Sequence, residues 1–124
     1  MSRNDDAAAI EAAFRKMNLP AAQKHIFLCV GPDCCPTEQG LAVWETLKQA
    51  VKNHSASVLR TKAACLRVCC GGPWMVVYPE GIWYGAVTSE RCERIVREHI
   101  LEGRPVEEWI QRVHPLAPPE LSPE

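Results

Sequence analysis

The chain has 124 residues, enough for one domain that removes roughly two-thirds of its unfolded surface from water. Its 14 Lys and Arg against 15 Asp and Glu give a net charge of -1, which argues against a protein that binds the phosphate backbone of nucleic acids. No apolar run approaches the ~20 residues of a membrane span, and the charged start lacks the pattern of a secretory leader, so we expect a cytoplasmic protein without a membrane partner.

The first predicted element is an amphipathic helix over residues 5–17, which ends at an Asn-Leu-Pro sequence. Its apolar residues recur at helical spacing: Ile10, Ala13, Phe14 and Met17. Stripes of this kind normally pack against a core, so we expect the helix to lie on the domain. Residues 1–24 form an N-terminal helical extension in this interpretation.

The next segments alternate between strands and helices. The apolar run at residues 25–30 predicts a buried strand, and the apolar spacing over residues 37–53 predicts a helix. Residues 57–61 predict a second strand, followed by a loop over residues 62–72. The near-continuous apolar run at residues 74–78 is typical of a covered strand.

A hairpin and a helix follow. A Pro-Glu-Gly turn predicts a hairpin between residues 75–78 and 82–84. Thr88 or Ser89 caps the next predicted helix, and Gly103 ends it. Its predicted buried stripe consists of Cys92, Ile95, Val96, His99 and Ile100.

This order of elements predicts an α/β domain over residues 25–113. A parallel βαβ start and an antiparallel ββα end match a thioredoxin-like arrangement, with a mixed four-stranded sheet covered by helices. Residues 106–113 suggest a short turn of helix at the end of the domain. Residues 114–124 are rich in proline, so we expect an extended or disordered tail.

Seven cysteines are the unusual feature of the composition. In a reducing compartment they indicate metal binding or catalysis more often than disulfides. Cys92 stands apart on the predicted buried stripe, where we expect a small core residue. The others form two groups, each after an apolar strand: Cys29 with Cys34 and Cys35, and Cys65 with Cys69 and Cys70.

Two cysteine pairs with short spacings, Cys29-x4-Cys34 and Cys65-x3-Cys69, can chelate metal. Four thiolates that arrive as two pairs suit a [2Fe-2S] cluster, in which each iron takes two protein sulfurs. The same four could close a tetrahedral zinc site, although neither pair has the commonest zinc spacing. Unliganded or redox-active thiols are a third alternative, but the sequence lacks a Cys-x-x-Cys motif.

The second cysteine loop is basic, since residues 55–72 contain Arg60, Lys62 and Arg67 and no acid. An exposed basic rim beside a metal site could steer an acidic redox partner. The glycines at 71–72 permit a close approach of the backbone, whose amides could point at sulfur.

These residues resemble the thioredoxin-fold [2Fe-2S] ferredoxins, relatives of the small cluster-bearing subunit of respiratory NADH dehydrogenases. The resemblance covers residues 25–110. It rests on the Cys-x3-Cys pair, on Gly72-Pro73 after it, and on Val77-Tyr-Pro-Glu-Gly-Ile-Trp-Tyr-Gly85. It implies a one-electron carrier rather than an enzyme. The implied ligands of its [2Fe-2S] cluster are Cys29, Cys34, Cys65 and Cys69.

The resemblance also implies a homodimer and redox partner proteins whose identity differs among members. Cys35 adjoins Cys34 and is the alternative second ligand; we prefer Cys34 because of its family-like x4 gap. Two other functions remain open at this point. One is a structural zinc module that binds proteins, and the other is an electron-transfer subunit of a larger oxidoreductase.

Overall fold

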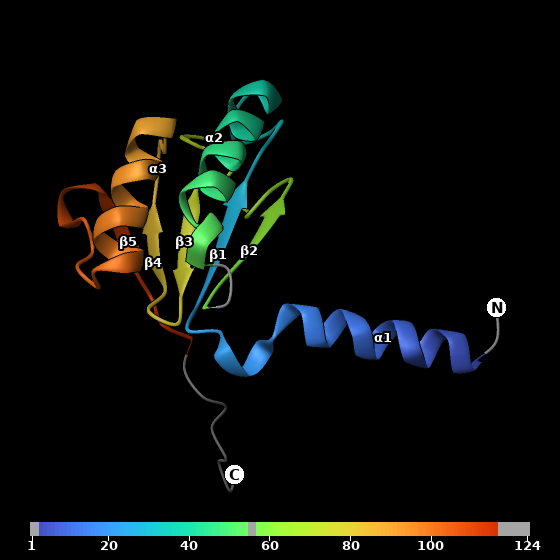
Figure 1. Cartoon of the computed structure of the whole chain (residues 1–124). Helices are drawn as coiled ribbons and strands as arrows, with labels where there is room; N and C mark the ends of the chain where they lie inside the picture. Colours follow the sequence, from blue (N-terminus) through green and yellow to red (C-terminus); the bar gives the residue numbers. More distant parts are fainter. Residues whose placement is uncertain (1–2, 55–56, 117–124) are drawn as a thin grey trace, which may run out of the picture.

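A computed structural model describes residues 3–54 and 57–116 of the chain. Five strands form one mixed sheet in the order β2-β1-β3-β4-β5 (Figure 1). The parallel pair β1 and β2 lies at one side, and β3, β4 and β5 continue the sheet with antiparallel pairing. The strands are β1 Lys24–Cys29, β2 Val58–Ala63, β3 Met75–Tyr78, β4 Ile82–Tyr84 and β5 Ile110–Val113.

The helices follow the predicted boundaries closely. They are α1 Arg3–Met17, α2 Thr37–Ala50 and α3 Ser89–Ile95, which continues as a π-helical segment, η3 Val96–Leu101. Short 3-10 turns occupy η1 Leu19–Ala21, η2 Lys52–His54 and η4 Glu107–Trp109. Thr88 caps α3 as expected, because its hydroxyl accepts a hydrogen bond from the backbone N–H of Arg91 at 3.1 Å.

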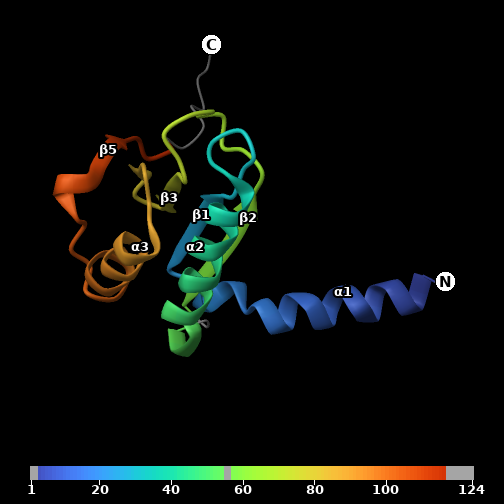
Figure 2. The same cartoon turned by 90° about the horizontal axis from the view of Figure 1, so that it is seen from above.

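The main core lies between the sheet and the helices α2 and α3, which cover the same face of the sheet (Figures 1 and 2). Successive strand residues point to opposite faces, so Ile26 and Leu28 of β1 enter this core and Cys29 points to the other face. The predicted helical stripe is buried throughout, and Cys92 is a fully buried core residue as predicted.

The sheet has five strands, so the prediction of four was wrong. Residues 106–113 were expected to form a short helical turn rather than a strand. Only η4 is helical, and the segment then pairs along the open edge of β4. Long-range strand pairing therefore overrides the local pattern here.

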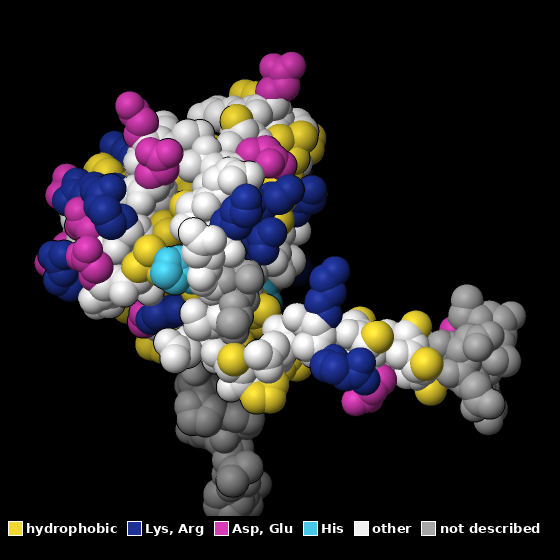
Figure 3. Space-filling model, viewed as in Figure 1, with side chains coloured by type: hydrophobic (Ala, Val, Ile, Leu, Met, Phe, Trp, Pro, Cys, Tyr) yellow, Lys and Arg dark blue, Asp and Glu magenta, His cyan; other side chains and the backbone are white. Residues whose placement is uncertain are grey.

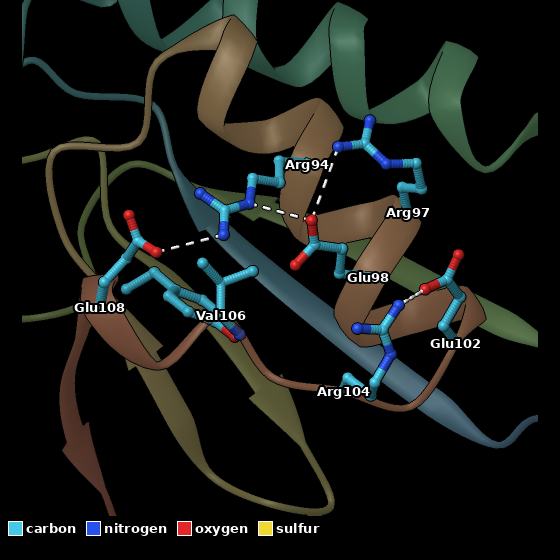
Figure 4. A network of polar contacts seen from close by, with 8 residues as sticks. Arg94, Arg97, Glu98, Glu102, Arg104, Val106 and Glu108 are labelled. Carbon is cyan, nitrogen blue, oxygen red and sulfur yellow. Dashed lines mark hydrogen bonds and ion pairs between the residues drawn. The ribbon is translucent and has the colours of Figure 1, made fainter.

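Charged side chains hold the segment before β5 against the last helix (Figure 4). The guanidinium of Arg94 donates to Glu98 at 3.0 Å and to Glu108 at 3.1 Å. It also lies 4.8 Å from the centre of the Trp109 ring, in cation–π contact. These contacts connect α3 to η4 and so position β5.

A buried polar chain connects the β3–β4 hairpin to the last helix. The ring of His99 is fully buried, with Nδ1 2.8 Å from the Tyr84 hydroxyl and Nε2 3.0 Å from a Glu80 carboxylate oxygen. The Tyr84 hydroxyl also accepts a hydrogen bond from the backbone N–H of Val106 at 3.1 Å. Glu80 in turn pairs with Lys24 at the start of β1. These contacts satisfy the buried Tyr84 hydroxyl and His99 ring, which would otherwise be costly to bury, whereas the second carboxylate oxygen of Glu80 is buried without a partner among the described residues.

The helix α1 does not lie on the domain, contrary to expectation. It extends away from the sheet and leaves its apolar side chains exposed (Figures 1 and 3). Ile10 and Phe14 are 55% and 52% exposed. Periodicity alone predicts an apolar face but not what covers it. None of the described helices is long and apolar enough to cross a membrane. Most of the Pro-rich tail, residues 117–124, lies outside the described part of the chain.

Candidate metal centre

The loop between β1 and α2 and the loop between β2 and β3 carry the two cysteine groups, and they lie side by side at one end of the sheet (Figure 2). Cys29 is the last residue of β1 and is fully buried. Cys34 and Cys35 follow in the loop before α2 and form a small buried cluster with Cys29. Leu66, within the second cysteine group, and Trp74, after it, pack against this cluster. The structure thus brings together the loops that the sequence analysis singled out.

Close backbone packing joins the two loops at Gly72. Its N–H donates a hydrogen bond to the carbonyl of Cys34 at 3.0 Å. A Cβ atom added to Gly72 would lie 2.9 Å from that carbonyl oxygen and 3.0 Å from the Cys34 Cβ. No other residue type fits without a shift of the loop, because real Cβ contacts are longer. The close approach expected of this glycine is therefore present, and its target is Cys34.

The cysteine sulfurs lie at distances suited to metal binding. The Sγ atoms of Cys65 and Cys69 are 3.8 Å apart, as are those of Cys34 and Cys35. A tetrahedral metal with metal–sulfur bonds of about 2.3 Å holds two thiolates about 3.8 Å apart. Within the described residues, no three His, Cys, Asp or Glu side chains are grouped to hold one metal ion. One close pair, Cys65 with Cys69, is a predicted ligand pair. The other, Cys34 with Cys35, joins the predicted second ligand to its alternative, and Cys34 also neighbours the Cys29 thiol.

Backbone amides point at two of the predicted ligands. The N–H of Trp74 donates to the Cys29 Sγ at 3.0 Å, and the N–H of Arg67 donates to the Cys65 Sγ at 3.1 Å. Such hydrogen bonds favour the negative thiolate and raise the reduction potential of a bound cluster. The Trp74 donor follows the Gly71–Pro73 segment, near which amide donors were expected, whereas the N–H of Gly72 itself binds a carbonyl. The Arg67 donor was not predicted, because Arg67 adopts a φ of 77°, which nothing in the local sequence signals.

Burial favours the protonated form of the Cys29 and Cys35 thiols. It raises the pKa of Cys29 to about 12, and the neighbouring Cys34 thiol adds to this effect. Burial likewise raises the pKa of Cys35 to about 11. Contact with Cys65 raises the pKa of Cys69, which is exposed. These groups are thus neutral thiols at pH 7 unless a bound cation compensates the charge of the thiolate.

The remaining cysteines differ in their surroundings. Cys34 neighbours the Cys29 thiol and contacts Gly72. Cys35 neighbours Cys34, and the backbone N–H of Gly40 in α2 forms a hydrogen bond to its thiol that lowers its pKa in part. Cys70 is exposed, and its carbonyl accepts a hydrogen bond from the Trp74 indole at 2.7 Å.

Comparison with known proteins places these features in a family, although no family profile matches the chain. The "Ferredoxin, 2Fe-2S" of Clostridium pasteurianum is 34% identical over 91 residues, which cover 66% of this chain and 89% of that protein. The "Ferredoxin, 2Fe-2S" of Aquifex aeolicus is 30% identical over 97 residues, 70% of this chain and 87% of that protein.

The solved structures give the same result for the fold. A structure of a thioredoxin-like [2Fe-2S] ferredoxin from Aquifex aeolicus superposes with a TM-score of 0.69 and 29% identity, covering 82% of this chain and all of that chain. The wild-type crystal structure superposes with a TM-score of 0.64 and 30% identity, over 73% of this chain and 97% of that one. The prediction of a thioredoxin-like α/β fold is confirmed.

Proposed function

The chain belongs to the thioredoxin-like [2Fe-2S] ferredoxins, and on this premise we propose that Cys29, Cys34, Cys65 and Cys69 hold its cluster. The protein is an electron carrier rather than an enzyme, with a [2Fe-2S] cluster as cofactor. When bound, such a cluster accepts and releases one electron. One observation supports the assignment of the ligands: the loop that carries Cys65 and Cys69, whose sulfurs are 3.8 Å apart, packs against the loop of Cys34 through the Gly72 backbone.

The residues around the cysteines perform separate tasks in this proposal. The end of β1 fixes Cys29 in a dry environment, and the N–H of Trp74 offsets part of the charge on its sulfur. The N–H of Arg67 does the same for Cys65. Cys65 is partly exposed and Cys69 is exposed, so this edge of the centre faces solvent and a redox partner can approach it.

Metal and sulfide analysis of freshly prepared protein tests the proposal. We expect a brown protein with about two irons and two acid-labile sulfides per chain. Cys29→Ser, Cys65→Ser and Cys69→Ser should each lower the cluster content or change the visible spectrum. A colourless protein that contains one zinc per chain would contradict the assignment and favour the structural zinc module.

We also propose that the protein forms a homodimer. The support is the exposed apolar stripe of α1, because large apolar side chains on a projecting helix are costly to leave in water. Sedimentation velocity of the intact chain tests this proposal. A dimer is expected. A monomer that aggregates until another protein is added would favour the alternative, an electron-transfer subunit of a larger oxidoreductase.

A cytoplasmic location is the last part of the proposal. No disulfide joins any of the seven cysteines, and cysteines that bind metal instead of forming disulfides are typical of a reducing compartment. Fractionation of cells that produce the intact chain tests this, with recovery in the cytoplasmic fraction expected. Recovery from the periplasm or the culture medium would contradict it.

A further inference from the structure

We propose that an open hollow beside the cysteines docks a redox partner with an acidic surface and a protruding apolar side chain. The inference rests on the proposed function. The hollow has a volume of about 520 Å³ and lies between the second cysteine loop and β5. We call it the tryptophan hollow; its lining includes Val68, Trp74, Trp83, Arg112, Val113 and His114.

The tryptophan hollow is directly connected to the proposed cluster ligands. Val68 immediately precedes Cys69, and the backbone N–H of Trp74 donates to the Cys29 Sγ at 3.0 Å. The Trp74 side chain packs against the buried cysteines, and its indole N–H holds the carbonyl of Cys70. A group bound in the hollow is therefore separated from the buried cysteines and from Cys70 by the Trp74 side chain. Electron transfer falls steeply with distance, so this is a favourable place for a partner's redox centre.

The shape and composition suit a protein rather than a small molecule. Trp74 and Trp83 pack edge to face, with ring centres 6.5 Å apart, and both are only half buried. Val113, which also lines the hollow, is 58% exposed. A small ligand would remain largely in solvent here, whereas binding pockets enclose most of their ligand. Tryptophan and arginine around an apolar centre are typical of protein interfaces.

The charge of this surface favours an acidic partner. None of the residues that line the tryptophan hollow is an acid. Arg112, on the edge strand, and Arg67, in the cysteine loop, are both exposed and take part in no ion pair with the described residues. Asp33, near Cys69, is an opposing charge in the cysteine loop region. Unpaired cations around an apolar centre increase the rate of encounter with carboxylates.

Electron transfer to two probe proteins of opposite charge tests the proposal. The cluster content is measured first, so that failure of the proposed function is recognised separately. The reduced protein then passes one electron to the haem iron of cytochrome b5, whose haem edge is ringed by carboxylates, or of cytochrome c, whose haem edge is ringed by lysines. The cluster is oxidised and the ferric haem is reduced to the ferrous state. We expect the rate constant with cytochrome b5 to fall as salt is added.

Substitutions then locate the surface. Arg112→Glu should lower the rate constant with cytochrome b5 by ~fivefold or more at low salt. The matched control is Lys52→Glu, which changes the net charge equally but lies in η2, at the end of β2 away from the cysteines. Val113→Ser should weaken binding about threefold, with little change in salt dependence. Isothermal titration of the oxidised proteins measures the same differences without electron transfer.

Three results would overturn the proposal. The first is an equal effect of Arg112→Glu and Lys52→Glu in a protein with normal cluster content. The second is faster reaction with cytochrome c than with cytochrome b5 at low salt, after correction for driving force. The third is dissociation of a dimer by Arg112→Glu in sedimentation, since the tryptophan hollow would then hold a second copy of this chain.

Discussion

Gly72 lies against Cys34 so closely that an added Cβ would be 2.9 Å from the Cys34 carbonyl oxygen. The contact joins two loops that are far apart in sequence, and it is a contact between backbones. The contact therefore sets the distance between the loop of Cys34 and the loop that carries Cys65 and Cys69. A change at Gly72 tests this relationship without altering any proposed ligand.

We expect Gly72→Ala to lose most of the iron, because the added methyl group forces the second loop away from Cys34. The control is Gly103→Ala: Gly103 has a φ of 77° and nothing within 4 Å of an added Cβ. It should lose about 1–2 kcal/mol of stability through backbone strain and keep its cluster. Iron analysis and the visible spectrum measure the difference. Normal iron content in Gly72→Ala would show that the loop contact is dispensable.

The choice between Cys34 and Cys35 leads to a second prediction. Cys34 neighbours both Cys29 and Gly72, whereas Cys35 lies toward α2. Cys34→Ser should therefore change or remove the visible absorption, and Cys35→Ser should leave it unchanged. Cys70→Ser, at an exposed thiol next to another proposed ligand, is the matched control and should also leave it unchanged. The opposite result for Cys34 and Cys35 would identify Cys35 as the ligand.

A third prediction concerns the buried hydroxyl of Tyr84. Tyr84→Phe leaves the backbone N–H of Val106 and the Nδ1 atom of His99 without a partner, at a cost of about 1–3 kcal/mol. Urea unfolding of the cluster-loaded protein measures this loss. Tyr78→Phe is the control, because the Tyr78 hydroxyl makes no hydrogen bond within the described residues. Equal stability of the two variants would contradict a structural role for the hydrogen bonds of Tyr84.

The sequence predicted the features that depend on local chemistry. Thr88 caps α3 and Gly103 follows the last helix because capping and turn preferences act over a few residues. The positions of the two cysteine groups were also predicted correctly, since each group comes at or after the end of a strand. Features set by distant contacts were missed. Examples are β5, which forms along β4, and the amide of Arg67, which reaches Cys65 through a left-handed backbone.

A fourth prediction follows from the buried polar chain. Burial lowers the pKa of His99, so the unfolded chain binds a proton more readily than the folded one below pH 6.5, the ordinary His value. Burial acts to raise the pKa of Glu80, but hydrogen bonds from Lys24 and His99 outweigh it and lower the pKa. Glu80 therefore stabilises the folded state at pH values above 4.5, its ordinary pKa, and this stabilisation is lost as the pH falls through the pKa of the folded state. Stability should therefore decrease from pH 7 toward pH 4.

Urea unfolding at pH 7 and pH 5 measures this dependence. His99→Gln should reduce it, although burial lowers the pKa of His25 too, so part of the slope should remain. His54→Gln, at an exposed histidine, is the control and should keep the full dependence. If His99→Gln destabilises the protein too much to study, the unsubstituted protein alone still tests whether stability decreases as the pH falls. Greater stability at pH 5 than at pH 7 would contradict the assignment.

The last prediction concerns α1, whose apolar side chains contribute little to the core. Deletion of residues 1–17 should leave the iron content unchanged and alter the free energy of unfolding of the remaining domain by less than about 0.5 kcal/mol. If the stripe of α1 holds a dimer together, the shortened chain should sediment as a monomer. Phe14→Asp in the full chain should have the same effect, because the carboxylate is costly to bury in an apolar contact. Glu11→Asp, an acidic replacement on the same helix, is the control. A shortened chain that loses its iron would show instead that residues 1–17 belong to the cluster-binding domain.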